Sequence, residues 1–293
     1  MRDFDEHNIT AAVLDRVANT PDPRLRLIMD GLVRHLHDFV RETEPSFREW
    51  EQAIDFLTRT GQMCSSTRQE FILLSDTLGV SMLVDAVNHR LPEGVTETTV
   101  LGPIYVENPP ELPHGHDVSG GLPGEPVFIS GRVSTSDGAA IPGAIVDIWH
   151  SDADGFYDVQ HAEPMTPSLR ARFRTDETGA FHFWSIMPRY YAIPHDGTVG
   201  TMLAATARHP YRPAHVHFMI SAPGFEKLVT HLFSDDSPYL DSDAVFGVKN
   251  SLIRCFTREP PGLAPDGTML TRPWRRLFHD FALGRQPPAP DAS

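Results

Sequence analysis

The sequence predicts a mostly β protein with α structure, in which an N-terminal helical part precedes an antiparallel β-sandwich or barrel. Up to about residue 95, apolar residues recur every three or four positions, which places them on one face of a helix. Beyond that point the chain carries short runs rich in Val, Ile and Phe, bounded by Gly, Pro or Asp. Such runs are typical of strands, and their close spacing favours a sandwich or barrel over a doubly wound sheet.

The N-terminal pattern predicts helices over residues 9–17, 25–39, 47–57 and 71–87. Ser46 and Glu49 have the spacing of a capping box, which predicts that the third helix begins there. The segment 71–87 is so densely apolar that we expect little of it to be exposed. The apolar stripes of these helices need a partner, either the rest of the chain or a second subunit.

The second part of the chain predicts strands over residues 127–133, 144–149, 171–174, 181–184, 216–220 and 228–233. Asp137-Gly138 and the four residues 176–179 are turn signals, and we expect the second turn to join its two neighbouring strands as a hairpin. The Pro-rich stretch from residue 260 is expected to wrap the surface and to end in a frayed tail.

Composition excludes several classes of function. The 293 residues include 25 Lys and Arg but 39 Asp and Glu, a net charge of −14, which argues against a nucleic-acid or anionic-membrane partner. We find no signal peptide and no apolar run near the ~18–20 residues that span a bilayer, so a cytoplasmic protein is expected. The two cysteines lack the spacing of a zinc site and do not form a disulfide scaffold.

One histidine pair has the geometry of a metal chelate. His35 and His37 lie on a predicted helix, where residues two apart point about 200° away from each other. His215 and His217 lie on a predicted strand, where residues two apart point to the same face. Two such imidazoles can bind one transition metal, and Arg212 places a fixed cation at the start of the same strand.

The remaining donors in this half of the chain are tyrosines. No carboxylate stands close enough in sequence to complete a zinc or ferrous site, which argues against a zinc hydrolase. The candidates are Tyr157 and the neighbours Tyr190 and Tyr191. Because phenol titrates near ~10, it binds only an ion acidic enough to hold phenolate at neutral pH, such as ferric iron. Alternatively, these tyrosines are core or rim residues of a non-catalytic sandwich, such as a transthyretin-like or carbohydrate-binding module.

The chain resembles the intradiol ring-cleavage dioxygenases, non-haem ferric enzymes that open catechols between their two hydroxyls. The order Tyr, Tyr, His-x-His is specific to that family, and the match covers most of the chain. It runs through Leu101-Gly102-Pro103, Ile141-Pro142-Gly143-Ala144, Asp147-Ile148-Trp149-His150, Asp154-Gly155-Phe156-Tyr157 and Arg212-Pro213-Ala214-His215-Val216-His217.

The resemblance implies two domains with different tasks. Residues 1–98 would form a helical domain and linker through which the protein forms a homodimer, often around bound phospholipid. Residues 99–293 would form the catalytic β-sandwich, which binds ferric iron. No organic cofactor is implied.

The same resemblance assigns the metal ligands. They are Tyr157, Tyr191, His215 and His217, the four protein ligands of Fe(3+). Tyr191 is preferred to Tyr190 because it stands three residues before Pro194, as the ligand tyrosine of the family does.

Three residues are candidates for catalysis. Arg212 matches the arginine that lies against the bound substrate and supplies positive charge where the ring becomes negative. Tyr157 takes up one of the protons that the diol loses when it binds iron. His231 stands where catechol-type members usually carry glutamine, so its role beside the metal is left open.

The substrate is expected to be hydroxyquinol (benzene-1,2,4-triol). Residues 73–85 and 191–197 look most like the hydroxyquinol 1,2-dioxygenase branch, in which Leu73 and Asp76 belong to a helix above the pocket. Asp76 would accept a hydrogen bond from the third hydroxyl, unless it is simply a solvated helix residue. The opposite wall would consist of Val100, Leu101 and Gly102.

The implied reaction consumes O2 and gives 3-hydroxy-cis,cis-muconate, the enol form of maleylacetate, in the degradation of aromatic compounds. The alternative within the same chemistry is a catechol or chlorocatechol 1,2-dioxygenase.

Overall fold

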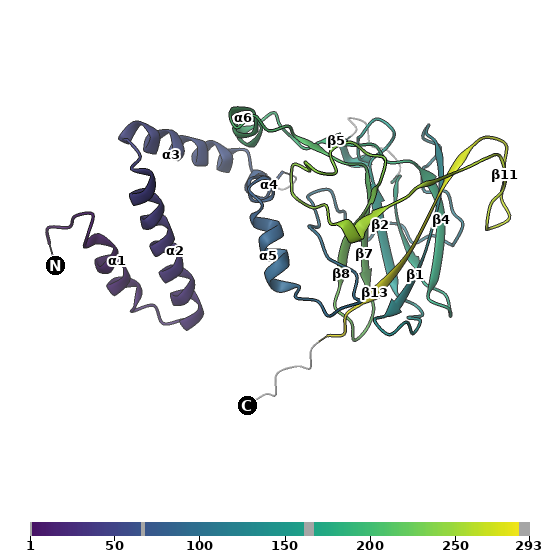
Figure 1. Cartoon of the computed structure of the whole chain (residues 1–293), viewed down its shortest axis with the longest axis horizontal. Coiled ribbons are helices and arrows are strands. Elements are labelled where there is room, and N and C mark those ends of the chain that lie inside the picture. The colour runs from purple at the N-terminus through teal and green to yellow at the C-terminus, as the bar shows by residue number, and fades with distance from the viewer. Residues whose placement is uncertain (1, 66–67, 161–166, 287–293) are drawn as a thin grey trace. The chain divides into compact units, whose positions relative to one another are not determined.

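The structure, a computed structural model, describes residues 2–65, 68–160 and 167–286 (Figure 1). The chain divides into two compact units, residues 1–62 and residues 63–293, and each is described by itself. The first unit is helical, and the second contains the β-sheets, so the predicted class of helices followed by a β-sandwich is confirmed. The boundary expected between residues 98 and 99 concerns the division of function and stays a prediction.

The first unit contains the helices expected there. They are α1 (Ile9–Val17), α2 (Pro23–Thr43) and α3 (Phe47–Gln62). The capping box before α3 is present, because the backbone N–H of Glu49 donates to Ser46 Oγ at 3.3 Å and the N–H of Ser46 donates to Glu49 Oε2 at 2.8 Å. Within the described ranges, no helix has both the length and the apolar content to cross a bilayer.

The helices of the second unit differ from the prediction. They are α4 (Glu70–Thr77), α5 (Val80–Asn88) and α6 (Thr198–Ala205), with two short 3-10 turns, η1 (Asp158–Gln160) and η2 (Asn250–Leu252). The single helix expected over 71–87 is wrong, because Gly79 adopts φ 73° and separates α4 from α5. The expected lack of exposure is also wrong, since Leu83 is 64% exposed.

Two large sheets make up the sandwich. The first has the order β10-β13-β1-β4 and consists of β1 (Pro126–Thr135), β4 (Ala180–Ile186), β10 (Thr257–Glu259) and β13 (Trp274–Leu283). The second has the order β3-β2-β7-β8-β9 and consists of β2 (Ile145–His150), β3 (Arg170–Arg174), β7 (His215–Ser221), β8 (Leu228–Ser234) and β9 (Ile253–Arg254). Two small pairs complete the unit: β5 (Tyr191–Ala192) with β6 (Tyr211–Arg212), and β11 (Gly262–Leu263) with β12 (Met269–Leu270). The six strands expected from the sequence are all present.

The two sheets share one apolar core. Val216, Phe218 and Ile220 of β7 are all 0% exposed and belong to the same buried cluster as side chains of the other sheet. Those side chains include Val127, Ile129, Val133, Phe181, Phe183, Leu277 and Phe281. Because successive residues of a strand point to opposite faces, the inward position of Val216 and Phe218 turns His215 and His217 outward.

The strand register sets three rings in a row on that outward face. His217 of β7 lies opposite Trp149 of β2 on one side and opposite His231 of β8 on the other. Trp149 stacks on His217, with ring centroids 4.5 Å apart and planes 15° apart. The plane of the His217 ring is therefore fixed by the sheet itself.

The hairpin expected at residues 176–179 is wrong. The turn is present, because Asp176 Oδ1 accepts hydrogen bonds from the backbone N–H groups of Thr178 and Ala180 at 2.8 and 3.0 Å. However, β3 pairs with β2 while β4 pairs with β1, so the turn carries the chain from one sheet to the other. Phe173 and Phe183 then stack across the core with centroids 5.0 Å apart.

The stretch after residue 260 does more than wrap the surface. Residues of β13 form an interior strand between β10 and β1, and β13 runs parallel to β1. Its Arg275 is 7% exposed and pairs with Glu125 and Asp236 at 3.0 and 2.9 Å, which lets a charged residue belong to a buried strand. The expected tail, residues 287–293, lies outside the described residues.

Phe218→Ala should lower the free energy of unfolding by about 3–5 kcal/mol, because it removes a fully buried ring from between the sheets. Phe278 on β13 is 55% exposed, so Phe278→Ala should change that free energy by less than about 0.5 kcal/mol. Urea denaturation of the two variants measures the difference. Equal losses would contradict the assignment of inner and outer faces.

Candidate metal centre and substrate pocket

Buried side chains that are candidate metal ligands converge on the outward face of the five-stranded sheet. The Nε2 atoms of His215 and His217 lie 3.1 Å apart. The Oη atom of Tyr157 lies 3.1 Å from His217 Nε2. These side chains are only 1–2% exposed, so their donor atoms meet where water has little access.

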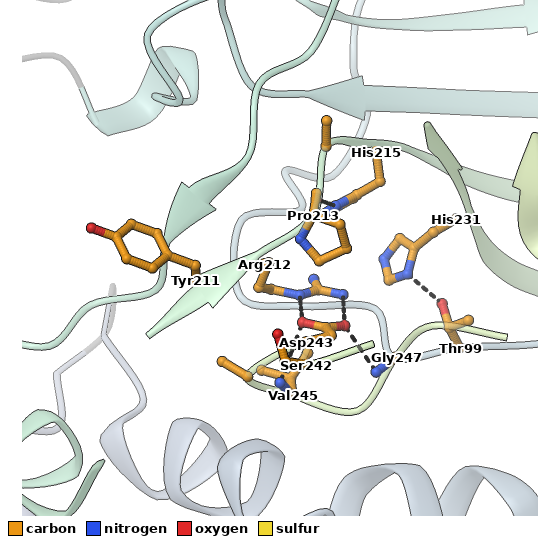
Figure 2. Close-up of polar contacts among 12 residues, drawn as sticks. Thr99, Tyr211, Arg212, Pro213, His215, His231, Ser242, Asp243, Val245 and Gly247 are labelled. Atoms are coloured by element: carbon orange, nitrogen blue, oxygen red, sulfur yellow. Dashed lines mark hydrogen bonds and ion pairs between the residues drawn. The ribbon is translucent and has the colours of Figure 1, made fainter. Parts of the chain in front are cut away.

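The hydrogen bonds of His215 leave its Nε2 free to bind a cation. His215 Nδ1 lies 2.7 Å from the carbonyl oxygen of Pro213, which can only accept, so the ring proton is on Nδ1 (Figure 2). Burial lowers the pKa of His215 and of His217 well below the usual value, so both rings are neutral at neutral pH. Neutral imidazole is the form that binds a metal ion.

Behind His217, two more residues continue the hydrogen-bonded chain. His231 Nε2 lies 2.7 Å from His217 Nδ1, and Thr99 Oγ1 lies 2.7 Å from His231 Nδ1 (Figure 2 shows the second pair). When His217 donates its Nδ1–H to His231, its Nε2 carries the lone pair toward Tyr157. One ring nitrogen from each of His215, His217 and His231 lies within 4.8 Å of the others, a grouping that could hold a metal ion.

A tight turn brings Tyr157 to the histidines. The Asp152 Oδ1 atom accepts a hydrogen bond from the backbone N–H of Phe156 at 2.9 Å, and Gly155 adopts φ 92°. A Cβ on Gly155 would lie 3.1 Å from the Cβ of Tyr191. Glycine at this position therefore allows the turn that carries Tyr157 to approach the segment that carries Tyr191.

Of the two adjacent tyrosines, Tyr191 is the one that faces the cluster. Its ring centroid lies 5.4 Å from that of Tyr157 and 5.7 Å from that of His215. Tyr190 packs instead against Tyr211, at 5.9 Å. The structure thus brings together the four expected ligands, two on β7, one on β5 and one after the Gly155 turn.

Arg212 is a buried cation whose direction is set by Asp243 (Figure 2). Its Nε and Nη2 atoms donate to the two carboxylate oxygens at 3.0 and 3.2 Å, and the two side chains are 3% and 2% exposed. The backbone N–H of Gly247 also donates to Asp243 at 2.9 Å, and a Cβ on Gly247 would lie 2.9 Å from Arg212 Nη2. Burial alone would lower the pKa of Arg212, but the Asp243 charge raises it overall, so Arg212 stays positively charged.

A small pocket lies beside this cation, entirely within the second unit. It is lined by Leu73, Asp76, Val100, Gly102, Pro103, Ile104, Gln160, Tyr191, Ile193, Pro194, Arg212 and Val245. All the residues expected to contact the substrate line this pocket except Leu101, which is 39% exposed. Gly102 adopts φ 75°, and a Cβ there would lie 3.5 Å from His217 Cε1, so this wall passes close to the metal-binding side chains.

Asp76 is a buried carboxyl in the wall of the pocket. It is 4% exposed, so the alternative of a solvated helix residue is wrong. Burial raises the pKa of Asp76, and the negative charge of Asp243 adds to this rise. A hydrogen bond from Ser81 and the positive charge of Arg212 oppose it. The carboxyl therefore faces the pocket with a pKa above that of an ordinary aspartate.

Asp243, Thr99 and Gln160 were not singled out from the sequence. Asp243 is 31 residues from Arg212, and Thr99 is 132 residues from His231, so no local spacing connects them. The one local signal for Asp243 in the sequence is the apolar pair Ala244-Val245 that directly follows it.

The donor set of the cluster combines oxygen and nitrogen atoms. Tyr157 and Tyr191 offer phenol oxygens, and His215 and His217 offer neutral nitrogens. Burial and the neighbouring Tyr191 raise the pKa of Tyr157 well above its usual value in the metal-free protein. Only a strongly Lewis-acidic cation could keep such a phenol ionised, so the arrangement fits a metal of that kind.

Comparison with known protein families agrees with this geometry. The family model described as Dioxygenase matches residues 100–266, and the model described as Catechol dioxygenase N terminus matches residues 22–96. The chain belongs to the intradiol ring-cleavage dioxygenase family and is an enzyme of that class. This excludes the alternative of a non-catalytic β-sandwich.

Several characterised relatives match almost the whole chain. The 6-chlorohydroxyquinol 1,2-dioxygenase of Cupriavidus pinatubonensis is 54% identical, and the alignment covers 97% of this chain and 99% of the relative. The hydroxyquinol 1,2-dioxygenase of Rhizobium sp. strain MTP-10005 is 47% identical over 96% of each chain. The crystal structure of hydroxyquinol 1,2-dioxygenase from Pseudomonas putida DLL-E4 superposes with a TM-score of 0.91 at 46% identity, covering 96% of this chain and 99% of that one.

Asp243→Asn should lower the free energy of unfolding by about 3–5 kcal/mol, because it leaves the Arg212 charge buried without its partner. Asp241→Asn removes the same charge two residues away at an exposed position and should change stability by less than about 0.5 kcal/mol. Thermal and urea denaturation measure both variants. A fully stable Asp243→Asn protein would show that Arg212 does not depend on this carboxylate.

Proposed function

We propose that this protein is a ferric-iron dioxygenase that uses O2 to open hydroxyquinol between adjacent hydroxyls. The product would be 3-hydroxy-cis,cis-muconate, the enol form of maleylacetate, in aromatic-compound degradation. The observation that carries the proposal is the convergence of the Tyr157, His215 and His217 donor atoms beside a pocket that contains Arg212 and Asp76. The names of the relatives, which specify hydroxyquinol or its chlorinated form, support the choice of substrate.

Tyr157, Tyr191, His215 and His217 would hold the iron. Bound ferric iron supplies the Lewis acidity that draws electron density from a chelated diol and prepares it for reaction with dioxygen. His231 Nε2 accepts the Nδ1–H of His217, and this keeps the lone pair of His217 Nε2 directed at the site. Tyr157 would be a phenolate while it holds the iron, so its Oη could take up one of the two protons that the diol loses, and hydroxide would take up the other.

The pocket supplies charge and selectivity. Arg212 places a fixed positive charge where the ring becomes negative, in a site that has little contact with water. Asp76 accepts a hydrogen bond from the third hydroxyl of the substrate. Leu73, Val100 and Gly102 form apolar walls around the ring, and contact with Leu101 stays a prediction.

Asp76 is also the reason to prefer hydroxyquinol over catechol or chlorocatechol. A diol without the third hydroxyl would offer the buried Asp76 carboxyl no donor at the ring edge, and its binding would lack that hydrogen bond. A chlorinated hydroxyquinol keeps all three hydroxyls and is therefore a second candidate substrate, in line with the name of the Cupriavidus relative.

We also propose that two copies of the chain pair through the helical unit. Apolar side chains of α2 and α3 are between 46% (Leu57) and 87% (Phe47) exposed, although they form the stripes that need a partner. They are Leu25, Ile28, Leu32, Leu36, Phe39, Phe47, Trp50, Ile54 and Leu57. Bound phospholipid, a cytoplasmic location and the functional boundary at residue 98 stay predictions.

The purified protein should contain iron and be coloured, because phenolate bound to ferric iron absorbs visible light by charge transfer. Tyr191→Phe should shift or bleach the visible band, whereas Tyr190→Phe, which changes a ring outside the cluster, should leave it unchanged. Absorption spectra and metal analysis of the three proteins measure this. Removal of the iron by chelation should abolish O2 uptake with hydroxyquinol, and an active, iron-free preparation would contradict the proposal.

Asp76→Asn should lower kcat/KM for hydroxyquinol by about 10- to 100-fold, since a hydrogen bond to a charged group contributes about 1.5–3 kcal/mol. It should change kcat/KM for catechol by less than about twofold, because catechol lacks the third hydroxyl. Steady-state rates with the two substrates measure the ratio. Equal losses on both would remove Asp76 from the selectivity argument.

The preference for hydroxyquinol should also depend on pH through Asp76. The carboxyl accepts a hydrogen bond best when ionised, and its raised pKa means that the charge is lost as pH falls through a value above the ordinary one near ~4. The hydroxyquinol-to-catechol ratio of kcat/KM should therefore fall on acidification. In Asp76→Asn the ratio should not vary with pH, which separates this effect from the titration of other groups.

A further inference from the structure

Arg208, which lies outside the pocket lining, connects two backbone segments that are distant in sequence. It follows α6, where its own backbone N–H donates to the carbonyl oxygen of Leu203 at 2.8 Å. Its Nη1 donates to the carbonyl oxygen of Thr77 at 2.6 Å, and its Nη2 donates to that of Ala244 at 3.1 Å. These acceptors are 131 and 36 residues away, so a single guanidinium holds together the end of α4 and the loop after residue 240.

Each of the two carbonyls is next to a group that defines the pocket. Thr77 directly follows Asp76, the buried carboxyl of the pocket wall. Ala244 lies between Asp243, which orients Arg212, and Val245, which lines the pocket. The segments that Arg208 joins are therefore the one that carries Asp76 and the one that carries Asp243, the partner of Arg212.

A second contact reinforces the connection on the same side. The guanidinium of Arg208 lies 5.1 Å from the ring centroid of Phe246, the residue after Val245. The Phe246 ring in turn approaches the break between α4 and α5, because a Cβ on Gly79 would lie 3.5 Å from it. The flat guanidinium and the ring thus fill the space between the loop and the C-terminal end of α4.

Arg208 holds the two backbone segments together through its hydrogen bonds, and its charge does not act on the Asp76 carboxyl. The charged groups that shift the pKa of Asp76 are Arg212 and Asp243. Both acceptors of Arg208 are uncharged carbonyls, and its planar fork fixes their separation more rigidly than a single-point donor could.

We propose that Arg208 is a positioning residue for substrate selectivity, which fixes the span between Asp76 and Arg212 so that a ring with a third hydroxyl fits between them. This inference rests on the proposed function, and it adds a residue remote from the substrate to the groups that select it. Misplacement of a contact group by about 1 Å costs up to about 100-fold in rate, so an effect at this distance is large enough to measure.

The test compares Arg208→Met with the native enzyme on hydroxyquinol and catechol. Methionine keeps an apolar side chain over Phe246 but cannot donate to Thr77 or Ala244. The hydroxyquinol-to-catechol ratio of kcat/KM should fall by about tenfold, mainly through a higher KM for hydroxyquinol, while catechol turnover and the visible iron band stay unchanged. Arg285→Met is the matched control, because Arg285 also lies over a phenylalanine ring, that of Phe225 at 5.4 Å, but this ring belongs neither to α4 nor to the loop after residue 240.

Coupling to Asp76 distinguishes positioning from general damage. In an Asp76→Asn background, Arg208→Met should produce no further change in the substrate ratio, because the group that it positions is already absent. Arg208→Lys can donate to one carbonyl and should give an intermediate ratio, which provides a milder variant if Arg208→Met does not fold.

An unchanged ratio in both variants, or equal losses on the two substrates, would overturn the role of Arg208. Simply additive effects of Arg208→Met and Asp76→Asn on the substrate ratio would also overturn this role. Failure of the native enzyme to cleave hydroxyquinol would instead contradict the proposed function, so the two failures are distinguishable.

Discussion

The alternation of β7 is the constraint on which the rest of the site depends. Val216 and Phe218 fill the core between the sheets, and this leaves His215 and His217 on the outer face with no freedom to turn inward. A slip of one residue in register would bury the imidazoles in the apolar core and expose the aromatic ring. The hydrophobic energy of the core therefore holds these two candidate metal ligands in place, and the same register lines up Trp149 and His231 beside them.

The outward face of the sheet is covered rather than exposed to water, and most of the polar side chains described around the site have a partner, although the buried Nε1 of Trp149 has none. His215 is held by a backbone carbonyl, His217 by His231, and Arg212 by Asp243. Each of these bonds also sets the direction of the atom that faces the site. Satisfying a buried hydrogen-bonding group and orienting a functional one are the same requirement here.

Features with a local pattern were predictable from the sequence, and features that depend on distant partners were not. The strand carrying His215 and His217, the capping box at Ser46 and the turn at Asp176 all follow from neighbouring residues. That the Asp176 turn crosses between sheets, and that β13 pairs in parallel with β1, is decided by contacts far along the chain. The roles of Asp243 and Thr99 could not be predicted for the same reason, because each depends on a partner that is distant in the sequence.

Chemistry and selectivity have different structural origins in this fold. The metal-binding donors come mainly from the rigid sheet and from the turn at Gly155, whose positions follow from the core. The groups proposed to distinguish substrates come from α4 and from the loop around Val245, which line the pocket and do not take part in the ladders of the sheet. Such segments can change in sequence without disturbing the core. Because neither is held by strand pairing, other contacts must fix the distance between them. Under the role proposed for Arg208, side chains that span these segments are the places where a change in substrate preference could arise without a change in the donor atoms on the sheet.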